Sequence, residues 1–226
     1  MFTYHGGNKM KKIIGIIIFG MLLFTGIGAG SYQEAKISAL QKHPTTTEYD
    51  MVIIAPEVFN KNLQPLIAHK IAVGIQTVLL TTEEIYAKYE GRDAAEQIKY
   101  AIKDAKEQWN ISFVLLVGGM KPFGLGWYVP VRYSNLNDGS GNSVFLTDLY
   151  FADLYKENGE FDDWDSNGNG IFAEWGKDTL DLTPDVAIGR LPCRTPVEVD
   201  IIVDKIITYE TTAYGADWFH RFVCIA

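Results

Sequence analysis

The chain has 226 residues, of which 47% are hydrophobic and 21% are charged. This composition is typical of a packed globular protein and excludes a disordered chain. Its formal net charge is −8, but residues 1–30 hold three lysines and no acid, which leaves 17 basic against 28 acidic side chains, or −11, in the rest. Phosphate backbones repel so acidic a body, so we expect no nucleic-acid partner.

Residues 1–30 have the pattern of a secretion signal. Lys11 and Lys12 precede an apolar run, Ile13–Ile27, and small residues follow it. This order is typical of a cleaved signal peptide. An uncleaved N-terminal anchor is the alternative, because residues 13–30 are just long enough to span a bilayer. Both readings predict a secreted or extracellular protein, in contact with a membrane only through this segment.

The next elements alternate between strands and helices. After a polar linker, residues 31–48, apolar runs at 50–55, 75–80 and 111–117 predict buried strands. Apolar residues at helical spacing predict helices over 57–72 and 93–109, and Thr81 with Glu84 forms a capping box that opens a short helix between them. The fold class is therefore α/β, with a mostly parallel sheet flanked by helices.

The rhythm changes over residues 119–184, which are rich in Gly, Asn, Asp and aromatics and contain strand-like pieces at 128–133 and 144–151. We interpret this stretch as a β-rich insertion in an α/β subdomain of residues 49–216. A strand follows at 186–188, and Thr195-Pro196 with Glu198 predicts a second capping box and a helix to about residue 211. Residues 222–226 are apolar and predict a buried strand. Residues 217–226 would then begin a second, truncated subdomain of a longer protein.

The segment from Asp153 to Asp185 holds ten acidic residues and two lysines. So much like charge is costly unless something neutralises it. Residues 163–174, the acidic loop, satisfy the calcium-loop pattern D-x-[DN]-x-[DN]-G-x5-E, in which side-chain oxygens at alternate positions surround a hard cation. We therefore predict a Ca2+ site whose ligands are Asp163, Asp165, Asn167, Asn169, the backbone carbonyl of Ile171 or Asn169, and Glu174.

The register of this loop stays open. Counting from Asp163 places Glu174 at position twelve, but Gly170 then stands where an apolar residue normally pins the loop. Counting from Asp165 makes Phe172 the apolar pin and places Gly176 at position twelve. Both registers can use Glu174 as the closing ligand. The alternative to a metal site is a solvated Asn-Gly turn in an acidic protein.

No catalytic pair stands out among the cysteines and histidines. Catalysis by Cys and His needs the two side chains within hydrogen-bond reach, and neither Cys193 nor Cys224 has an evident histidine partner. The Gly118-Gly119 pair follows a strand, as phosphate-binding loops do. No helix start and no G-x-G-x-x-G follow it, which disfavours a nucleotide site.

Several strings occur together in a familiar order: Tyr49–Ile54, Val114–Gly119, Thr147–Asp153, Asp185–Pro192 with its Gly-Arg-Leu-Pro turn, the helix end Ile206–Glu210, and Phe222–Ala226. Over residues 48–226 the chain resembles the gingipain family of cysteine peptidases. The resemblance implies a secreted, caspase-like α/β catalytic unit in two halves, of which this chain holds the first, with calcium supporting the fold. It also implies attack of a Cys thiolate on protein or peptide substrates, with His as general acid/base.

In that family the catalytic His lies in a His-Gly pair and the Cys ends the next strand, both after the segment matching Phe222–Ala226. The only His-Gly pair here is His5-Gly6, which precedes the basic and apolar residues of the signal segment. No catalytic residue can therefore be carried onto this sequence, and we expect the chain alone to be inactive. The rival interpretation is a non-catalytic, calcium-dependent cell-surface or adhesion module on the same scaffold.

Overall fold

The computed structural model describes residues 48–135 and 144–224. Its centre is a sheet of four parallel strands in the order β2-β1-β3-β6. The strands are β1 (Met51–Ala55), β2 (Thr77–Thr81), β3 (Phe113–Val117) and β6 (Ala187–Leu191). Their register aligns Ile53 with Leu79 on one side and Leu115 on the other, and Leu115 in turn with Gly189. The predicted α/β fold class with a parallel sheet is confirmed.

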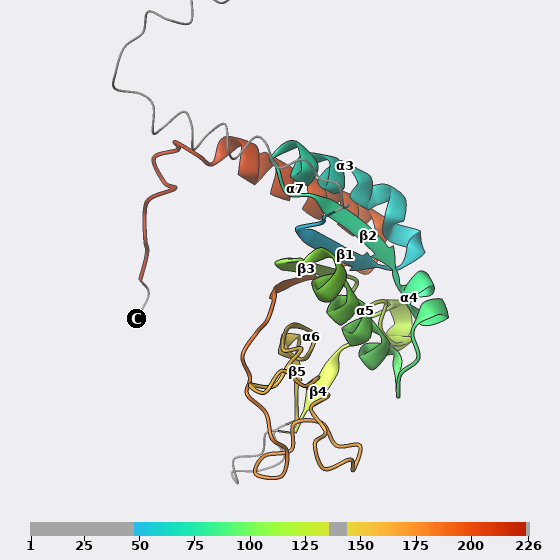
Figure 1. Ribbon diagram of the computed structural model, residues 1–226. Coiled ribbons are helices and arrows are strands. Elements are labelled where there is room, and N and C mark those ends of the chain that lie inside the picture. Colours follow the sequence, from blue (N-terminus) through green and yellow to red (C-terminus); the bar gives the residue numbers. More distant parts are fainter. Residues whose placement is uncertain (1–47, 136–143, 225–226) are drawn as a thin grey trace, which may run out of the picture. The chain divides into compact units, whose positions relative to one another are not determined.

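Helices cover both faces of this sheet (Figure 1). One face carries the 3-10 turn η1 (Glu57–Phe59) with helices α3 (Asn60–Ala72) and α7 (Pro196–Thr212). The other carries α4 (Thr82–Lys88) and α5 (Ala94–Trp109). Successive β1 residues point to opposite faces. Ile53 therefore packs with the α3 and α7 side chains, while Val52 and Ile54 pack with α5, and all three are fully buried.

The helix ends follow from local hydrogen bonds. The predicted capping box of α4 forms, since Thr81 Oγ1 accepts from the Glu84 N–H at 3.2 Å and the Glu84 carboxylate accepts from the Thr81 N–H at 2.9 Å. Only half of the second predicted box forms. Thr195 caps the first turn of α7, but the Glu198 carboxylate accepts from the Arg194 N–H at 2.6 Å instead of from the N–H of Thr195. The cap therefore extends one residue further upstream than expected.

The insertion between β3 and β6 has little regular structure. It contains the turn η2 (Pro122–Gly124), the antiparallel pair β4 (Arg132–Ser134) and β5 (Phe145–Thr147), and the short helix α6 (Leu149–Ala152). The strand predicted over 144–151 is therefore too long. The extended backbone ends at Thr147, and the Asp153 N–H donates to the Leu149 carbonyl at 2.9 Å. This bond closes one helical turn, which buries Tyr150, Phe151 and Ala152 under α5.

The buried strand predicted over residues 222–226 is not seen in the part that the structure describes. Residues 221–224 have no regular structure there, and Phe222 and Val223 are 92% and 77% exposed. A strand needs hydrogen-bonding neighbours on a sheet, and these residues have none among residues 48–135 and 144–224. The predicted signal or anchor segment, residues 1–30, and residues 31–47 of the predicted linker lie outside the described residues. Within the described residues, no helix has the length and apolarity needed to span a membrane.

Candidate functional site

Arg190 fastens the insertion to the sheet. Arg190 lies on β6, and its guanidinium donates two hydrogen bonds of 2.8 Å to the carboxylate of Asp148. It also donates to the backbone carbonyls of Gly118, Val129 and Pro130, at 2.8–2.9 Å. The Arg190 side chain is only 11% exposed. These five acceptors around one planar guanidinium link the Gly-Arg-Leu-Pro string of β6 with Asp148 and with the backbone after β3.

Gly119 is required by a close approach between the segments that follow β3 and β6. A Cβ atom at Gly119 would lie 2.4 Å from the carbonyl oxygen of Pro192, closer than real Cβ contacts allow. The Gly119 N–H donates to the carbonyl of Cys193 at 2.8 Å. The absence of a side chain at this position therefore serves the packing of two backbone segments, and this accounts for the glycine without a phosphate ligand.

Asp165 organises the acidic loop from within. Its two carboxylate oxygens accept from the backbone N–H groups of Asn169 at 2.9 Å and Gly170 at 3.0 Å. Gly168 and Gly170 have φ angles of +71° and +79°, which permit the sharp turn around this carboxylate. The loop is therefore closed around Asp165, with the side-chain oxygens of Asn167 and Asn169 each accepting a further backbone N–H.

Arg92 supplies positive charge to the loop, and no local pattern in the sequence predicted this contact. It donates to the Asp165 carboxylate at 2.7 Å and to Asp163 at 3.1 Å, and it also pairs with Glu96 on α5. The Asp165 side chain is 1% exposed and that of Arg92 is 40% exposed, so the pair is solvated on one side only. Arg92 thus partly neutralises the negative charge of Asp163 and Asp165, from which it is 71 and 73 residues distant in the sequence.

The far end of the loop is held by a second set of contacts. Asn169 donates to the Glu174 carboxylate at 2.9 Å, and Lys177 pairs with its other oxygen at 2.5 Å. The side chain of Phe172 lies 3.6 Å, measured to the ring centroid, from the guanidinium of Arg132. Phe172, the pin residue when the loop is counted from Asp165, thus contacts a cation from outside the loop.

The structure therefore brings the predicted ligands together in two linked pairs. Arg92 joins Asp163 with Asp165, and a hydrogen bond joins Asn169 with Glu174. The carboxyl groups are engaged by protein donors in this arrangement, so calcium at the loop stays a prediction.

Arg132 is a buried cation between the insertion and α5. Its guanidinium donates to both oxygens of Asp93, at 2.7 and 2.9 Å, and lies 4.4 Å from the ring centroid of Tyr150. Burial acts to raise the pKa of the Asp93 carboxyl, but the hydrogen bonds from Arg132 and from the N–H of Glu96 outweigh it and hold the pKa below its usual value. Asp93 is also the N-cap of α5, so one carboxylate anchors both the helix and the insertion.

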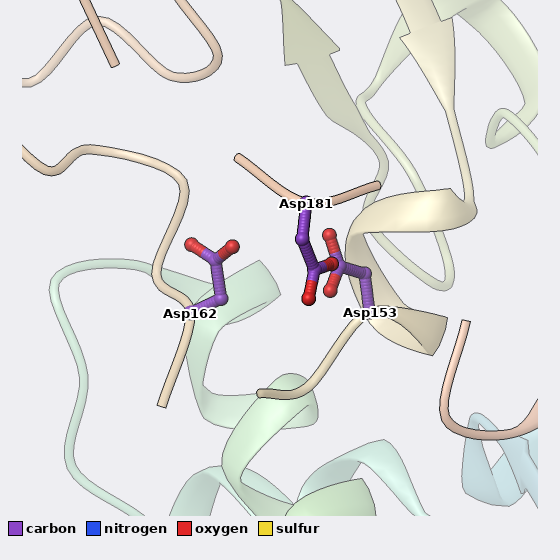
Figure 2. A group of neighbouring side chains, drawn as sticks. All are labelled: Asp153, Asp162 and Asp181. Carbon is purple, nitrogen blue, oxygen red and sulfur yellow. The ribbon is translucent and has the colours of Figure 1, made fainter. Parts of the chain in front are cut away.

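Three other aspartates meet beneath α5 (Figure 2). Asp153 follows α6, Asp162 precedes the acidic loop, and Asp181 lies on the path to β6. One carboxylate oxygen of each lies within 4.8 Å of the others. At an effective dielectric constant of about 20, two unit charges at that distance repel by about 3 kcal/mol. Burial raises the pKa of Asp153 to about 7 and also raises the pKa of Asp162.

Lys99 is a buried cation next to this group of aspartates, and the sequence pattern did not predict its burial. It is fully buried on α5, donates to the backbone carbonyl of Asp162, and lies 4.3 Å from the ring centroid of Tyr150. Burial lowers the pKa of Lys99 to about 8. The helical pattern had not placed Lys99 on the apolar face, and only the unusual density of acids over residues 153–185 hinted that a buried charge was needed nearby.

The two cysteines differ in exposure within the part of the chain that the structure describes. Cys193 is 4% exposed in the core between the sheet and α7, and burial raises the pKa of its thiol. Cys224 is exposed. His69 pairs with Glu210 at 2.8 Å across helices α3 and α7. Within residues 48–135 and 144–224, no cysteine forms a hydrogen bond with a histidine.

Comparisons with known proteins identify the family. The sequence profile of Peptidase family C25 matches residues 44–226. The dimeric latent PorU of Porphyromonas gingivalis superposes with a TM-score of 0.55 at 21% identity, over 76% of this chain and 16% of that one. The pro- and mature-domain complex of RgpB, from the same organism, gives 0.48 at 18% identity, over 70% and 28%.

No curated protein sequence matches the chain. The structural likeness to PorU, at 21% identity, supports the fold alone, and the chain spans less than a third of each of these two structures. The profile match, in contrast, runs from the end of the linker through the whole four-stranded unit. The chain therefore belongs to peptidase family C25, the gingipain family of cysteine peptidases.

Proposed function

We propose that the chain forms the N-terminal portion of a secreted gingipain-like cysteine endopeptidase that acts on proteins or peptides. The observation that carries this proposal is the family match over residues 44–226, which includes every strand of the sheet. A fold does not fix a function, so the proposal also depends on where a nucleophile can be found. It places the catalytic His and Cys outside this sequence.

The state of Cys193 supports that placement. A nucleophilic Cys needs an exposed thiol with a lowered pKa and a base within hydrogen-bond reach. Cys193 is 4% exposed and burial raises the pKa of its thiol. Its place in the core beside Val199 and Val203 is that of a small packing residue.

Peptide turnover by the purified chain tests this assignment. The full chain is incubated with an unstructured protein and with a panel of peptides, alongside Cys193→Ala and Cys224→Ala. We expect no turnover from any of the three. Turnover that either substitution abolishes would place the nucleophile within this sequence and overturn the assignment. The reading frame after Ala226 separates the peptidase from an adhesion module: a His-Gly pair and then a Cys at strand ends favour the peptidase.

Export is the next part of the proposal. It rests on the basic and apolar order of residues 1–30. Mass spectrometry of the protein from its native host should find a mature N-terminus near Gly30 or Ser31. An intact N-terminus recovered from the membrane fraction would favour the anchor instead.

We also propose that calcium stabilises the acidic loop, counted from Asp165. Three features support this register: the backbone N–H groups that close on the Asp165 carboxylate, the positive φ of Gly170, and the packed ring of Phe172. Oxygens of Asp165, Asn167, Asn169 and Glu174 and a backbone carbonyl are ligands that Ca2+ prefers. Calcium would take over from Arg92 as the charge that balances the loop.

Thermal unfolding with and without calcium tests the loop. Extracellular sites commonly bind at roughly 0.1–1 mM. A tenfold excess over the dissociation constant then gives about 1.4 kcal/mol of stabilisation, a rise of a few degrees in melting temperature. Asp165→Ala should reduce the rise, because Asp165 is a ligand in both registers. Asp163→Ala should leave the rise intact if the loop is counted from Asp165, and an equal loss in both variants would select the longer register.

A further inference from the structure

The three aspartates beneath α5 come from separate parts of the insertion. Figure 2 shows the carboxyl groups of Asp153 and Asp181 next to each other, with that of Asp162 facing them. Asp153 and Asp162 are both 0% exposed, and Asp181 is half-buried. Each carboxylate offers one oxygen to a common space in which these atoms lie within 4.8 Å of one another.

Trp164 orients two of these carboxylates and leaves one oxygen of each free. Its indole N–H donates to Asp153 Oδ2 at 2.8 Å, and its backbone N–H donates to Asp162 Oδ1 at 3.0 Å. The remaining atoms, Asp153 Oδ1 and Asp162 Oδ2, are buried and have no hydrogen-bond partner. The Thr183 N–H holds Asp181 in the same way, at 2.9 Å. Buried polar atoms without partners are rare, and two in one group need an explanation.

Lys99 does not provide that explanation. Its ammonium donates to the backbone carbonyl of Asp162 and faces aromatic rings, and among the described residues it forms no ion pair with the three carboxylates. When all three carboxyl groups are ionised, as they would be around a bound cation, the single charge of Lys99 leaves a net charge of −2. A divalent cation matches both that charge and the unpartnered oxygens.

We propose that Asp153, Asp162 and Asp181 bind one calcium ion. The donor set holds oxygen only, with no His or Cys, and so favours a hard cation over zinc. Calcium takes six to eight oxygens, so the three carboxylates would be completed by carbonyl groups or water, and the hydrogen bonds from Trp164 and Thr183 are the outer contacts that hold ligating carboxylates in place. The ion would join α6, the start of the acidic loop and the segment before β6 at one point.

This site shares no ligand with the acidic loop, because its ligands are Asp153, Asp162 and Asp181. The two sites are separated by substitution in the full chain. Asp181→Asn and Asp162→Asn remove charge from the aspartate site, Asp165→Asn removes it from the loop, and Glu160→Gln is an exposed control from the same acidic segment.

Calorimetric titration with Ca2+ should show that Asp181→Asn and Asp162→Asn weaken one site by at least about tenfold, as is typical when the surroundings of a metal ligand are disturbed. Asp165→Asn and Glu160→Gln should retain this site. Failure of the loop proposal would appear as unchanged binding in Asp165→Asn alone. Wild-type binding by both Asp181→Asn and Asp162→Asn would overturn the aspartate site.

Melting temperatures distinguish a metal ligand from a residue with only a structural role. In chelator, Asp181→Asn should melt at or above the wild type, since it removes a like charge from the group. In calcium it should melt below the wild type. Mg2+ should produce a smaller rise, because it prefers a tight octahedron and keeps its waters. An equal loss of melting temperature with and without calcium would overturn the proposal.

Discussion

Replacement of Arg190 by methionine tests whether one guanidinium holds the insertion on the sheet. The side chain is 11% exposed and its partner Asp148 is 26% exposed, so most of the pair is removed from water. Loss of one partner leaves the carboxylate and three backbone carbonyls without a donor. Breaking a buried pair in this way costs about 3–5 kcal/mol.

That magnitude is a large part of the stability of an ordinary domain, which is about 5–15 kcal/mol. For a chain of this size each kcal/mol shifts the melting temperature by about 2–4 °C, so Arg190→Met should melt about 6–20 °C below the wild type. Circular dichroism followed against temperature measures this. Arg190→Lys should fall between the two, because an ammonium keeps the charge but cannot reach five acceptors in one plane.

Arg194→Met is the matched control, since Arg194 is exposed on the same part of the chain, and it should stay within about 0.5 kcal/mol of the wild type. A double-mutant cycle with Asp148→Asn isolates the pair, and the two substitutions should couple by about 0.5–3 kcal/mol. A melting temperature for Arg190→Met within about 2 °C of the wild type would refute the reasoning, because the contacts would then contribute almost nothing.

Three further outcomes are expected. Gly119→Ala should lower the melting temperature strongly, whereas Gly189→Ala, where the nearest atom to a new Cβ is 3.9 Å away, should be tolerated. The lowered pKa of Asp93 means that its ionised form adds stability above the unfolded pKa of about 3.9 and loses it as pH falls through the folded pKa. The destabilisation by Asp93→Asn in urea unfolding should therefore be present at pH 7 and shrink below about pH 4. Iodoacetamide should label Cys224 well before Cys193 in the folded chain, and mass spectrometry of the labelled peptides should show equal labelling only after unfolding.

The sequence by itself determined the layered part of the fold. Strands such as β1 are short and apolar on both faces, which is possible only in a sheet covered on both sides. The capping residues Thr81 and Asp93 begin their helices through bonds to residues three positions on. These features depend on hydrogen bonds and periodicities within a few residues of chain, so a linear pattern contains them in full.

Only the tertiary structure decided which charged groups meet. The linear pattern of residues 163–174 predicted a single loop of ligands, but nothing in it placed Arg92 against Asp165, 73 residues away. The helical spacing leaves Lys99 off the apolar face of its helix, yet the side chain is fully buried because the irregular insertion folds over that side of α5. Asp153, Asp162 and Asp181 come together through the same folding. Such meetings depend on the path of a chain with no repeating hydrogen-bond pattern, and so no local rule of spacing predicts them.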